Sequence, residues 1–352
     1  MKSEGPTVKK ELFFYYFYNS IIPHVYLIES RKNKKMAKKK IGLPKGLLWY
    51  KYHNMWEKFF EKLGCETICS APTDQKMVEE GVRRSVDEIC IPVKIFYGHC
   101  LDIAGECDYI FIPRYWRVTK DSITCPKLIT TTDTTEQILK DEFPNKILTT
   151  TINLKIKSDF ASFFLLGLKI NKNPLKVMRA YREAIEAQKE HEENLEKKFE
   201  EKLSGSGIKL ALIGHEYNLY DHYINQELIA ELEKQDINVI TSDIVPKTIG
   251  EEALKGKPSI YWSYEKEIIG SAYWALASEK ISGLILISSF NCGPDSLLYE
   301  QVLLEDSGKP ILSMLIDEYT SKETIKTRID AFVELLTRKV SLKDEERNRQ
   351  FT

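Results

Sequence analysis

Three cysteines share an unusual setting in this 352-residue sequence. Cys90 is followed by Ile-Pro, Cys125 directly by proline, and Cys292 by Gly-Pro. Proline suits the first turn of a helix, because the N–H that it lacks would have no partner there. Cys125 follows a strand in this proline context, and Cys90 and Cys292 are predicted to lie at helix N-termini. Unpaired N–H groups and the positive end of the helix dipole favour a thiolate at such a place.

Three thiolates that converge would form a soft ligand set, suited to an iron–sulfur cluster, zinc or copper. Separated cysteines that follow strands are often only buried small residues, and their spacing alone leaves both interpretations open. The sequence has seven cysteines, an odd number at irregular spacing, which does not indicate a disulfide framework. For the other four, Cys65, Cys69, Cys100 and Cys107, core packing is the expected role.

The elements that would position these thiols alternate between strand and helix. The first half predicts strands at 41–44, 65–70 and 108–114, with helices at 47–64, 79–88 and 91–105. The second half predicts strands at 208–213, 237–241, 283–288 and 311–315, with helices at 225–234, 267–280, from 294 onward and at 324–337. Such alternation is typical of parallel sheets covered by helices on both faces.

We therefore expect an α/β protein with two Rossmann- or flavodoxin-like open parallel-sheet domains joined by a long helix. The first domain covers 41–173 and carries Cys90 and Cys125, and the second covers 208–340 and carries Cys292. The connector, 174–207, begins at a proline, ends in SGSG, and has apolar positions mainly near its two ends. We expect it to be solvated in its middle and to let the two domains move relative to each other. Residues 1–40 are aromatic and basic without clear periodicity, and we expect them to lie outside the fold, with Met36 as an alternative first residue.

Ligands in open parallel sheets bind beyond the carboxyl ends of the strands. Four residues with reactive side chains fall at such ends: His215, Asp243, Cys292 and Asp317. Further side chains could line a cleft there, although aromatic residues more often pack in a core and an arginine on the last helix is more often solvated: Glu216, Tyr217, Tyr261, Trp262 and Arg328.

The composition excludes several kinds of partner. There are 51 basic and 52 acidic residues, so the overall charge does not predict a nucleic-acid partner. No apolar run reaches the roughly 20 residues that cross a bilayer, and the start lacks the order of a secretory signal. No GxxxxGK[ST] loop is present to cradle a nucleotide phosphate. We expect a cytoplasmic protein without a membrane partner, and any ATP must bind elsewhere.

Several segments from both halves resemble one family. They are IGLPKGLLWYKY, DEICIPVKIFYGHCLD, DYIFIPR with TCPK, GHEYNLYD, IYWSYEKEIIGSAY, SSFNCGPDS and TRIDAF. They are similar to stand-alone proteins of the DUF2229 type, related to acyl-CoA dehydratase activases and to the subunits of 2-hydroxyacyl-CoA dehydratase and benzoyl-CoA reductase. The resemblance extends from about Ile41 to Leu336. The segment DEYTSKETIKTR departs from the family pattern, which puts a role for Asp317 and Glu318 in doubt.

The resemblance implies an oxygen-labile [4Fe-4S] cluster on Cys90, Cys125 and Cys292. In the dehydratase subunits such a cluster lies between the domains and takes a low-potential electron from a separate ATP-hydrolysing activase. It also implies an anaerobic setting, a homodimer or a related second subunit, and an acyl-CoA or other small substrate. An electron-transfer protein or scaffold without turnover, or an activase-associated regulatory protein that keeps its cysteines only for packing, remains open as an alternative.

Overall fold

The computed structural model describes the backbone of residues 38–350 and the side chains of residues 38–342. The expectations about the N-terminal extension and Met36 fall on residues outside this part. The described chain is a mixed α/β structure whose sheets are parallel, which confirms the predicted fold class. Within it, no helix combines the length and the apolar character that a membrane span requires.

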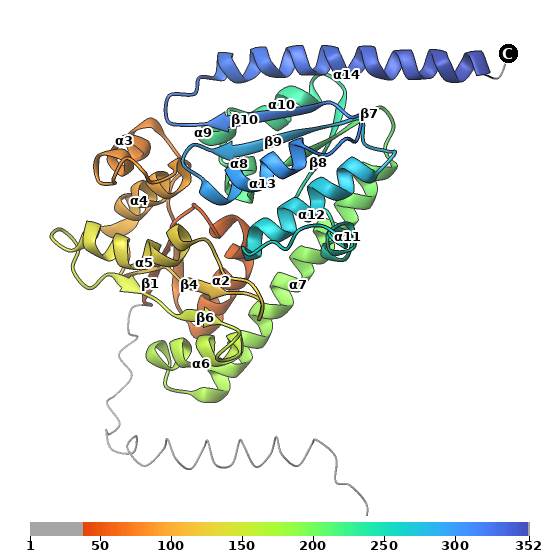
Figure 1. Cartoon of the computed structure of the whole chain (residues 1–352). Coiled ribbons are helices and arrows are strands. Elements are labelled where there is room, and N and C mark those ends of the chain that lie inside the picture. The colour runs from red at the N-terminus through yellow and green to blue at the C-terminus, as the bar shows by residue number, and fades with distance from the viewer. Residues whose placement is uncertain (1–37, 351–352) are drawn as a thin grey trace, which may run out of the picture. The chain divides into compact units, whose positions relative to one another are not determined.

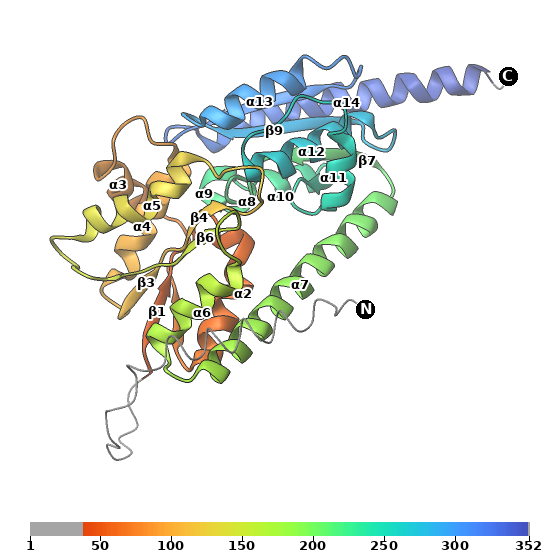
Figure 2. The same cartoon turned by 60° about the horizontal axis from the view of Figure 1, so that its bottom comes forward.

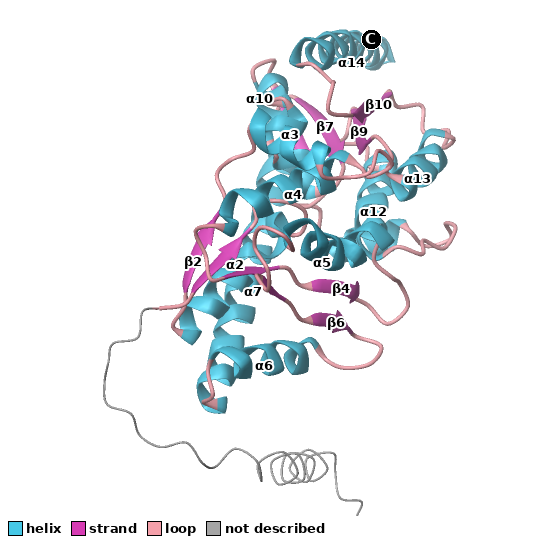
Figure 3. Cartoon of the chain, turned by 90° about the vertical axis from the view of Figure 1, so that its left-hand side faces the viewer, coloured by secondary structure: helices cyan, strands magenta, loops and turns pink. Residues whose placement is uncertain are grey.

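The first sheet has four parallel strands in the order β2-β1-β3-β5. A separate two-stranded parallel piece, β4 with β6, continues beside it and was not predicted (Figure 3). The strands of this half are β1 (Lys40–Leu43), β2 (Glu66–Cys69), β3 (Tyr109–Phe111), β4 (Arg114–Arg117), β5 (Ile147–Leu148) and β6 (Thr151–Asn153).

Helices cover both faces of the first sheet. One face packs on α2 (Trp49–Leu63), α6 (Asp159–Ile170) and the start of α7 (Pro174–Ser204), and the other on α4 (Ile91–Ala104) and α5 (Pro126–Leu139). Helix α2 ends as predicted at Gly64, which takes the left-handed conformation at φ 92°. Helix α3 (Gln75–Arg83) lies earlier than the predicted 79–88, with Asp74 as its N-cap.

The second sheet has the order β10-β9-β7-β8, with strands β7 (Ile208–Ile213), β8 (Ile237–Thr241), β9 (Gly283–Ser289) and β10 (Ile311–Ile316). Alternate residues of each strand enter two separate cores, as the two-residue period of a strand requires. One core includes α14 (Lys322–Gln350) and the other α12 (Ser263–Ala277), so the sheet lies between these helices (Figure 1). The remaining helices are α8 (Glu216–Tyr220), α9 (His222–Asn225), α10 (Leu228–Glu233), α11 (Lys247–Ala253) and α13 (Gly293–Leu303).

Helix α7 connects the two sheets and takes part in both cores, as Figure 2 lets the reader follow along its length. Its first half buries Val177, Ala180 and Ala184 beside the first sheet, and its second half buries Phe199 beside the second. The sequence predicted a solvated middle, but Gln188 is buried there and donates a hydrogen bond to the backbone carbonyl of Lys51 at 3.1 Å.

The two halves pack tightly on each other. Val78, Ile91 and Ile95 from α3 and α4 enter the core beneath the second sheet, while Tyr217 and Tyr264 from the second half enter a core of the first. Polar side chains join the halves as well, through pairs such as Lys94–Glu318, Ser122–Ser263 and Tyr223–Gln75. We expected α7 to let the halves move relative to each other. A buried apolar contact of this kind favours one fixed arrangement instead.

Candidate metal centre

Each of the three predicted cysteines is the N-cap residue of a helix. Cys90 precedes α4, Cys125 precedes α5 and Cys292 precedes α13, with proline in the first or second helical position each time. None of the three thiols makes a capping hydrogen bond, although backbone amides of the first turns offset part of the effect of burial on each thiol pKa. The prediction of a helix N-terminus is confirmed for Cys90 and Cys292, and Cys125 has the same setting in the structure.

Contacts between loops hold these N-termini next to one another. The Lys127 ammonium, in the first turn of α5, donates to the backbone carbonyls of Glu88 and Asn291, both at 2.7 Å. These residues lie two positions before Cys90 and one before Cys292. Asn291 adopts the left-handed conformation at φ 65° and its amide donates to the carbonyl of Asp87. One lysine of the Cys125 helix thus joins the loops that carry the other two thiols.

The three thiols interact electrostatically through Cys90. Burial raises the pKa of Cys125 to about 11, with smaller contributions from Glu265 and Cys90. Burial also raises the pKa of Cys292, and the Asp295 carboxylate and Cys90 raise it further. The pKa of Cys90 is raised by burial, against the favourable charge of Lys127. The sequence predicted thiolates from the unpaired N–H groups and the helix dipole. In the metal-free chain burial and the neighbouring carboxylate outweigh that effect, so a bound cation is needed to keep the sulfurs charged.

The spacing of the sulfurs distinguishes between kinds of metal site. Among the described residues, the set of three ligand atoms found within 4.8 Å of one another is His215, Glu265 and Asp295, and no three cysteines form such a set. A single tetrahedral ion with metal–sulfur bonds of about 2.3 Å would need its sulfurs about 3.8 Å apart. The described cysteines are therefore not placed for one tetrahedral ion.

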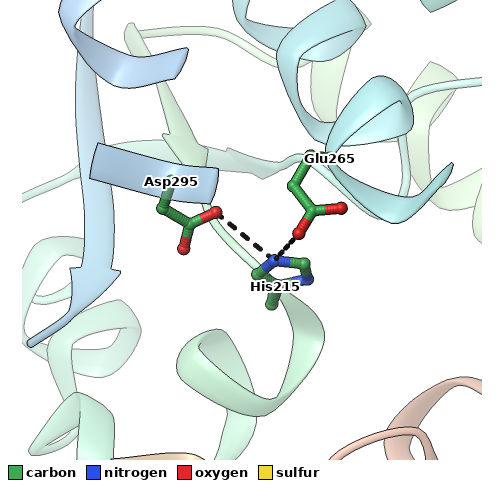
Figure 4. A group of neighbouring side chains, drawn as sticks. All are labelled: His215, Glu265 and Asp295. Atoms are coloured by element: carbon green, nitrogen blue, oxygen red, sulfur yellow. Dashed lines mark ion pairs between the residues drawn. The ribbon is translucent and has the colours of Figure 1, made fainter. Parts of the chain in front are cut away.

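A second group of buried polar side chains lies beside the cysteines. His215 Nε2 is 3.4 Å from Asp295 Oδ1 and 3.8 Å from Glu265 Oε1, and all three residues are at most 2% exposed (Figure 4). Burial lowers the pKa of His215, but the Asp295 and Glu265 charges raise it more, to about 9. Burial raises the pKa of Glu265. Asp295 also acts on Cys292 and Cys90, and Glu265 acts on Cys125.

The sheet topology explains why these groups meet. The chain leaves β7 toward β8 on one side and leaves β9 toward β10 on the other, so the switch point lies between β7 and β9. His215 follows β7, and Cys292 and Asp295 follow β9. Glu265 comes to the same place because Trp262, the N-cap of α12, forms a bridge with Ile123 in the loop before Cys125.

A third group occupies the contact between the halves. The Lys51 ammonium pairs with Glu216 at 2.9 Å and with Glu267 at 2.7 Å. Burial lowers the pKa of Lys51, but these carboxylates raise it well above its usual value. The pair borders a cavity of about 280 Å³ at the carboxyl ends of β7 and β8, which Asp243 and Tyr264 also line. No cysteine lines this cavity.

The remaining predicted cleft residues have ordinary structural roles. Tyr217 is buried and stacks on His215, with ring centroids 4.8 Å apart, whereas Tyr261 is exposed. Asp317 accepts hydrogen bonds within its own turn, and Arg328 is exposed and donates to the carbonyl of Ser313. The sequence did not single out Glu265 or Asp295. The predicted start of α12 at residue 267 excluded Glu265 from a helix, although a start at Ser263 places it in the first turn.

Comparison with known proteins adds a family. Among the curated proteins, none matches the chain. Two solved structures of the SBP FpvC from Pseudomonas aeruginosa, one with Ni2+ and one with Mn2+, align with 86% of this chain and with 98% and 99% of theirs. Their identities are 11% and 10% and their TM-scores 0.26 and 0.25, which carry no conclusion about fold or ligand.

The family model described as the CoA enzyme activase uncharacterised domain, DUF2229, matches residues 40–245, more than half of the chain. The matched part contains Cys90, Cys125 and His215, while Glu265, Cys292 and Asp295 lie beyond it. The chain therefore belongs to the family of the CoA enzyme activase uncharacterised domain.

Proposed function

We propose that Cys90, Cys125 and Cys292 hold one [4Fe-4S] cluster and that the protein uses it for low-potential electron transfer dependent on a separate ATP-hydrolysing activase. The observation that carries this proposal is that three thiols from both halves of the chain lie at three helix N-termini joined through Lys127. Membership of an activase-related family supports the link to an activase. The chain itself has no GxxxxGK[ST] loop.

The residues present fit such a cluster. The N–H groups of the three first turns would donate to the ligand sulfurs, and the nearby Lys127 ammonium would offset negative charge, both of which influence reduction potential. Cys292 is only 9% exposed and would shield one side from water, while Cys90 and Cys125 are half-buried and offer a side from which an electron can enter. When bound, a [4Fe-4S] cluster supplies one-electron chemistry at low potential.

Electron transfer is favoured over direct reduction of an acyl-CoA, because the cavity of about 280 Å³ is lined by no cysteine and is small for a CoA thioester. A dehydratase-like or reductase-like reaction on a small substrate would show itself as turnover when the activase, ATP and a reductant are supplied together. Absence of turnover, with a cluster that still cycles between two redox states, identifies an electron carrier.

Anaerobic purification followed by iron and acid-labile sulfide assays tests the cluster. We expect about four iron and four sulfide per chain, and a sharp loss of both in each of Cys90→Ser, Cys125→Ser and Cys292→Ser. Cys69→Ser is the matched control, since this half-buried thiol ends β2 and caps no helix, and it should keep full sulfide. Unchanged sulfide in all three serine variants, or a colourless chain, would refute the cluster and leave the activase-associated regulatory role.

The activase dependence needs its own measurement. Paramagnetic resonance should show a reduced cluster only when activase, ATP and reductant are all present. Full reduction by dithionite alone at neutral pH, or ATP hydrolysis by the purified chain, would contradict it and favour an ordinary electron carrier.

A further inference from the structure

The group formed by His215, Glu265 and Asp295 places two acidic side chains and one imidazole together in the interior. Two carboxylates lie side by side with each residue at most 2% exposed, where an uncompensated charge is strongly unfavourable. Among the described residues, His215 is the one basic side chain within 4.0 Å of either carboxylate. Lys51 and Lys127, which lie nearby in the fold, are held by other oxygens.

One polar atom on each side chain is left without a hydrogen-bond partner. These atoms are His215 Nε2, Glu265 Oε2 and Asp295 Oδ2, all buried. Figure 4 shows the imidazole nitrogen facing both carboxylates, which come from α12 and α13. Buried polar atoms are almost always paired, so three orphaned atoms in one place indicate a missing partner.

The distances identify the kind of partner. An N–H to O hydrogen bond is usually about 2.9–3.0 Å long, whereas the His215 nitrogen lies 3.4 Å and 3.8 Å from the carboxylate oxygens. Two ligands on one tetrahedral metal, each about 2.0–2.1 Å from it, lie about 3.3 Å apart. The separations are long for direct hydrogen bonds and close to the spacing of ligands that share an ion.

We propose that His215, Glu265 and Asp295 bind one divalent transition-metal ion, separate from the thiols of Cys90, Cys125 and Cys292. One imidazole nitrogen with two carboxylate oxygens suits Zn2+, Fe2+ or Mn2+, whereas Ca2+ and Mg2+ prefer oxygen alone and Cu+ prefers sulfur. Three protein ligands leave a coordination position open for water or a small molecule. The site lies at the switch point between β7 and β9, where open parallel sheets bind ligands.

This inference goes beyond the proposed electron transfer, so its test must not depend on the cluster. The full-length chain with Cys90, Cys125 and Cys292 all replaced by serine is stripped of metal and titrated with Co2+ under anaerobic conditions. We expect one equivalent to bind, with visible d–d absorption and without the intense near-ultraviolet bands of cobalt–thiolate bonds.

Ligand variants in the same background assign the site. Glu265→Gln and His215→Gln should each weaken Co2+ binding at least about tenfold. Glu267→Gln is the matched control, because this carboxylate lies two residues further along α12 and pairs with Lys51. It should bind Co2+ like its parent. Circular dichroism shows which variants fold, and Glu265→Gln, which removes a buried charge, is expected to fold even where His215→Gln does not.

Two results would overturn the site. One is a triple-serine chain that takes up no Co2+, which would mean that a proton on His215 is the only compensating charge. The other is a folded Glu265→Gln variant that binds Co2+ as tightly as its parent. In the unmodified, anaerobically purified chain, acid-labile sulfide reports the cluster and metal in excess of that sulfide reports this site, so either hypothesis can fail alone.

Discussion

The Lys51 group and the His215 group are two versions of one arrangement with opposite outcomes. Each places two carboxylates around one nitrogen-containing side chain at the contact between the halves. Lys51 reaches Glu216 and Glu267 at 2.9 and 2.7 Å, and the ion pairs are complete. The His215 nitrogen remains 3.4 and 3.8 Å from its carboxylates and leaves orphaned atoms.

The difference separates a structural contact from a candidate binding site. A lysine carries its own charge and three donors on a flexible stem, so it can satisfy two carboxylates by itself. An imidazole offers one nitrogen in this direction and cannot do the same. The carboxylates of the Lys51 group are neutralised by a lysine of the chain, and this group holds the halves together. The His215 group leaves polar atoms without partners, as expected at a site that takes up an ion.

The largest expected effect comes from removing the cation of the complete group. Lys51→Met keeps most of the side-chain volume but leaves Glu216 and Glu267 without their partner. Breaking a buried pair in this way costs about 3–5 kcal/mol of unfolding free energy. Guanidinium denaturation monitored by circular dichroism measures this loss.

The control for Lys51→Met is Lys58→Met on the same helix. Lys58 pairs with Glu61 at 3.0 Å on the exposed face, where ion pairs contribute at most about 1 kcal/mol. Equal losses for the two variants would show that the Lys51 group is no more than a surface ion pair.

A third buried side chain with a nitrogen, His99, extends the comparison to the pH dependence of the unfolding free energy. His99 is fully buried among neutral hydroxyls, with Ser70 Oγ at 2.9 Å and Thr73 Oγ1 at 3.0 Å, and burial lowers its pKa to about 4. The folded state therefore takes up this proton less readily than the unfolded state, whose histidine titrates near 6.5. Stability is unaffected above pH 6.5 and falls as the pH drops toward 4, by about 3 kcal/mol.

The unfolding free energy is measured between pH 4 and 7 for the unmodified chain and for His99→Gln. The difference between the two slopes of free energy against pH gives the contribution of His99. The slope should be smaller in the variant between pH 4 and 6.5, and the two slopes should agree above pH 6.5. A slope that His99→Gln leaves unchanged would assign the acid sensitivity to other groups.

The smallest effect concerns the support of Lys51. The buried Gln188 amide donates to the Lys51 carbonyl at 3.1 Å, so Gln188→Ala should lower the unfolding free energy by about 1 kcal/mol. Gln235→Ala, which removes an exposed amide bonded to Asp330, should change it by less than about 0.5 kcal/mol. If the two variants are equally stable, α7 does not help to position Lys51.

The sequence predicted the features that depend on local patterns. Strand and helix alternation gave the α/β class, and proline two positions after Cys90 and Cys292 gave their helix N-termini, because the ring suits the first turn whatever lies around it. Helices α5 and α6 were not predicted, and short elements such as β4, β6, α8 and α11 were missed as well.

The groups formed by residues far apart could not be predicted in the same way. Lys51 lies in an amphipathic helix, where a lysine is normally solvated, and its partners Glu216 and Glu267 come from the other half. Glu265 and Asp295 are single acidic residues near helix starts, and only tertiary contacts bring them to His215. The thiolate prediction was wrong for a related reason, since burial is a property of the whole fold.

Helix α7 has a consequence for how this protein unfolds. One uninterrupted 31-residue helix supplies Val177 to the first core and Phe199 to the second. Unfolding of either half would therefore remove packed side chains from the core of the other half. Unfolding by heat or denaturant should therefore be a single cooperative transition, and species with only one half folded should have a low population. A protease in the cell would find either the intact protein or a fully opened chain, with little between them to cut.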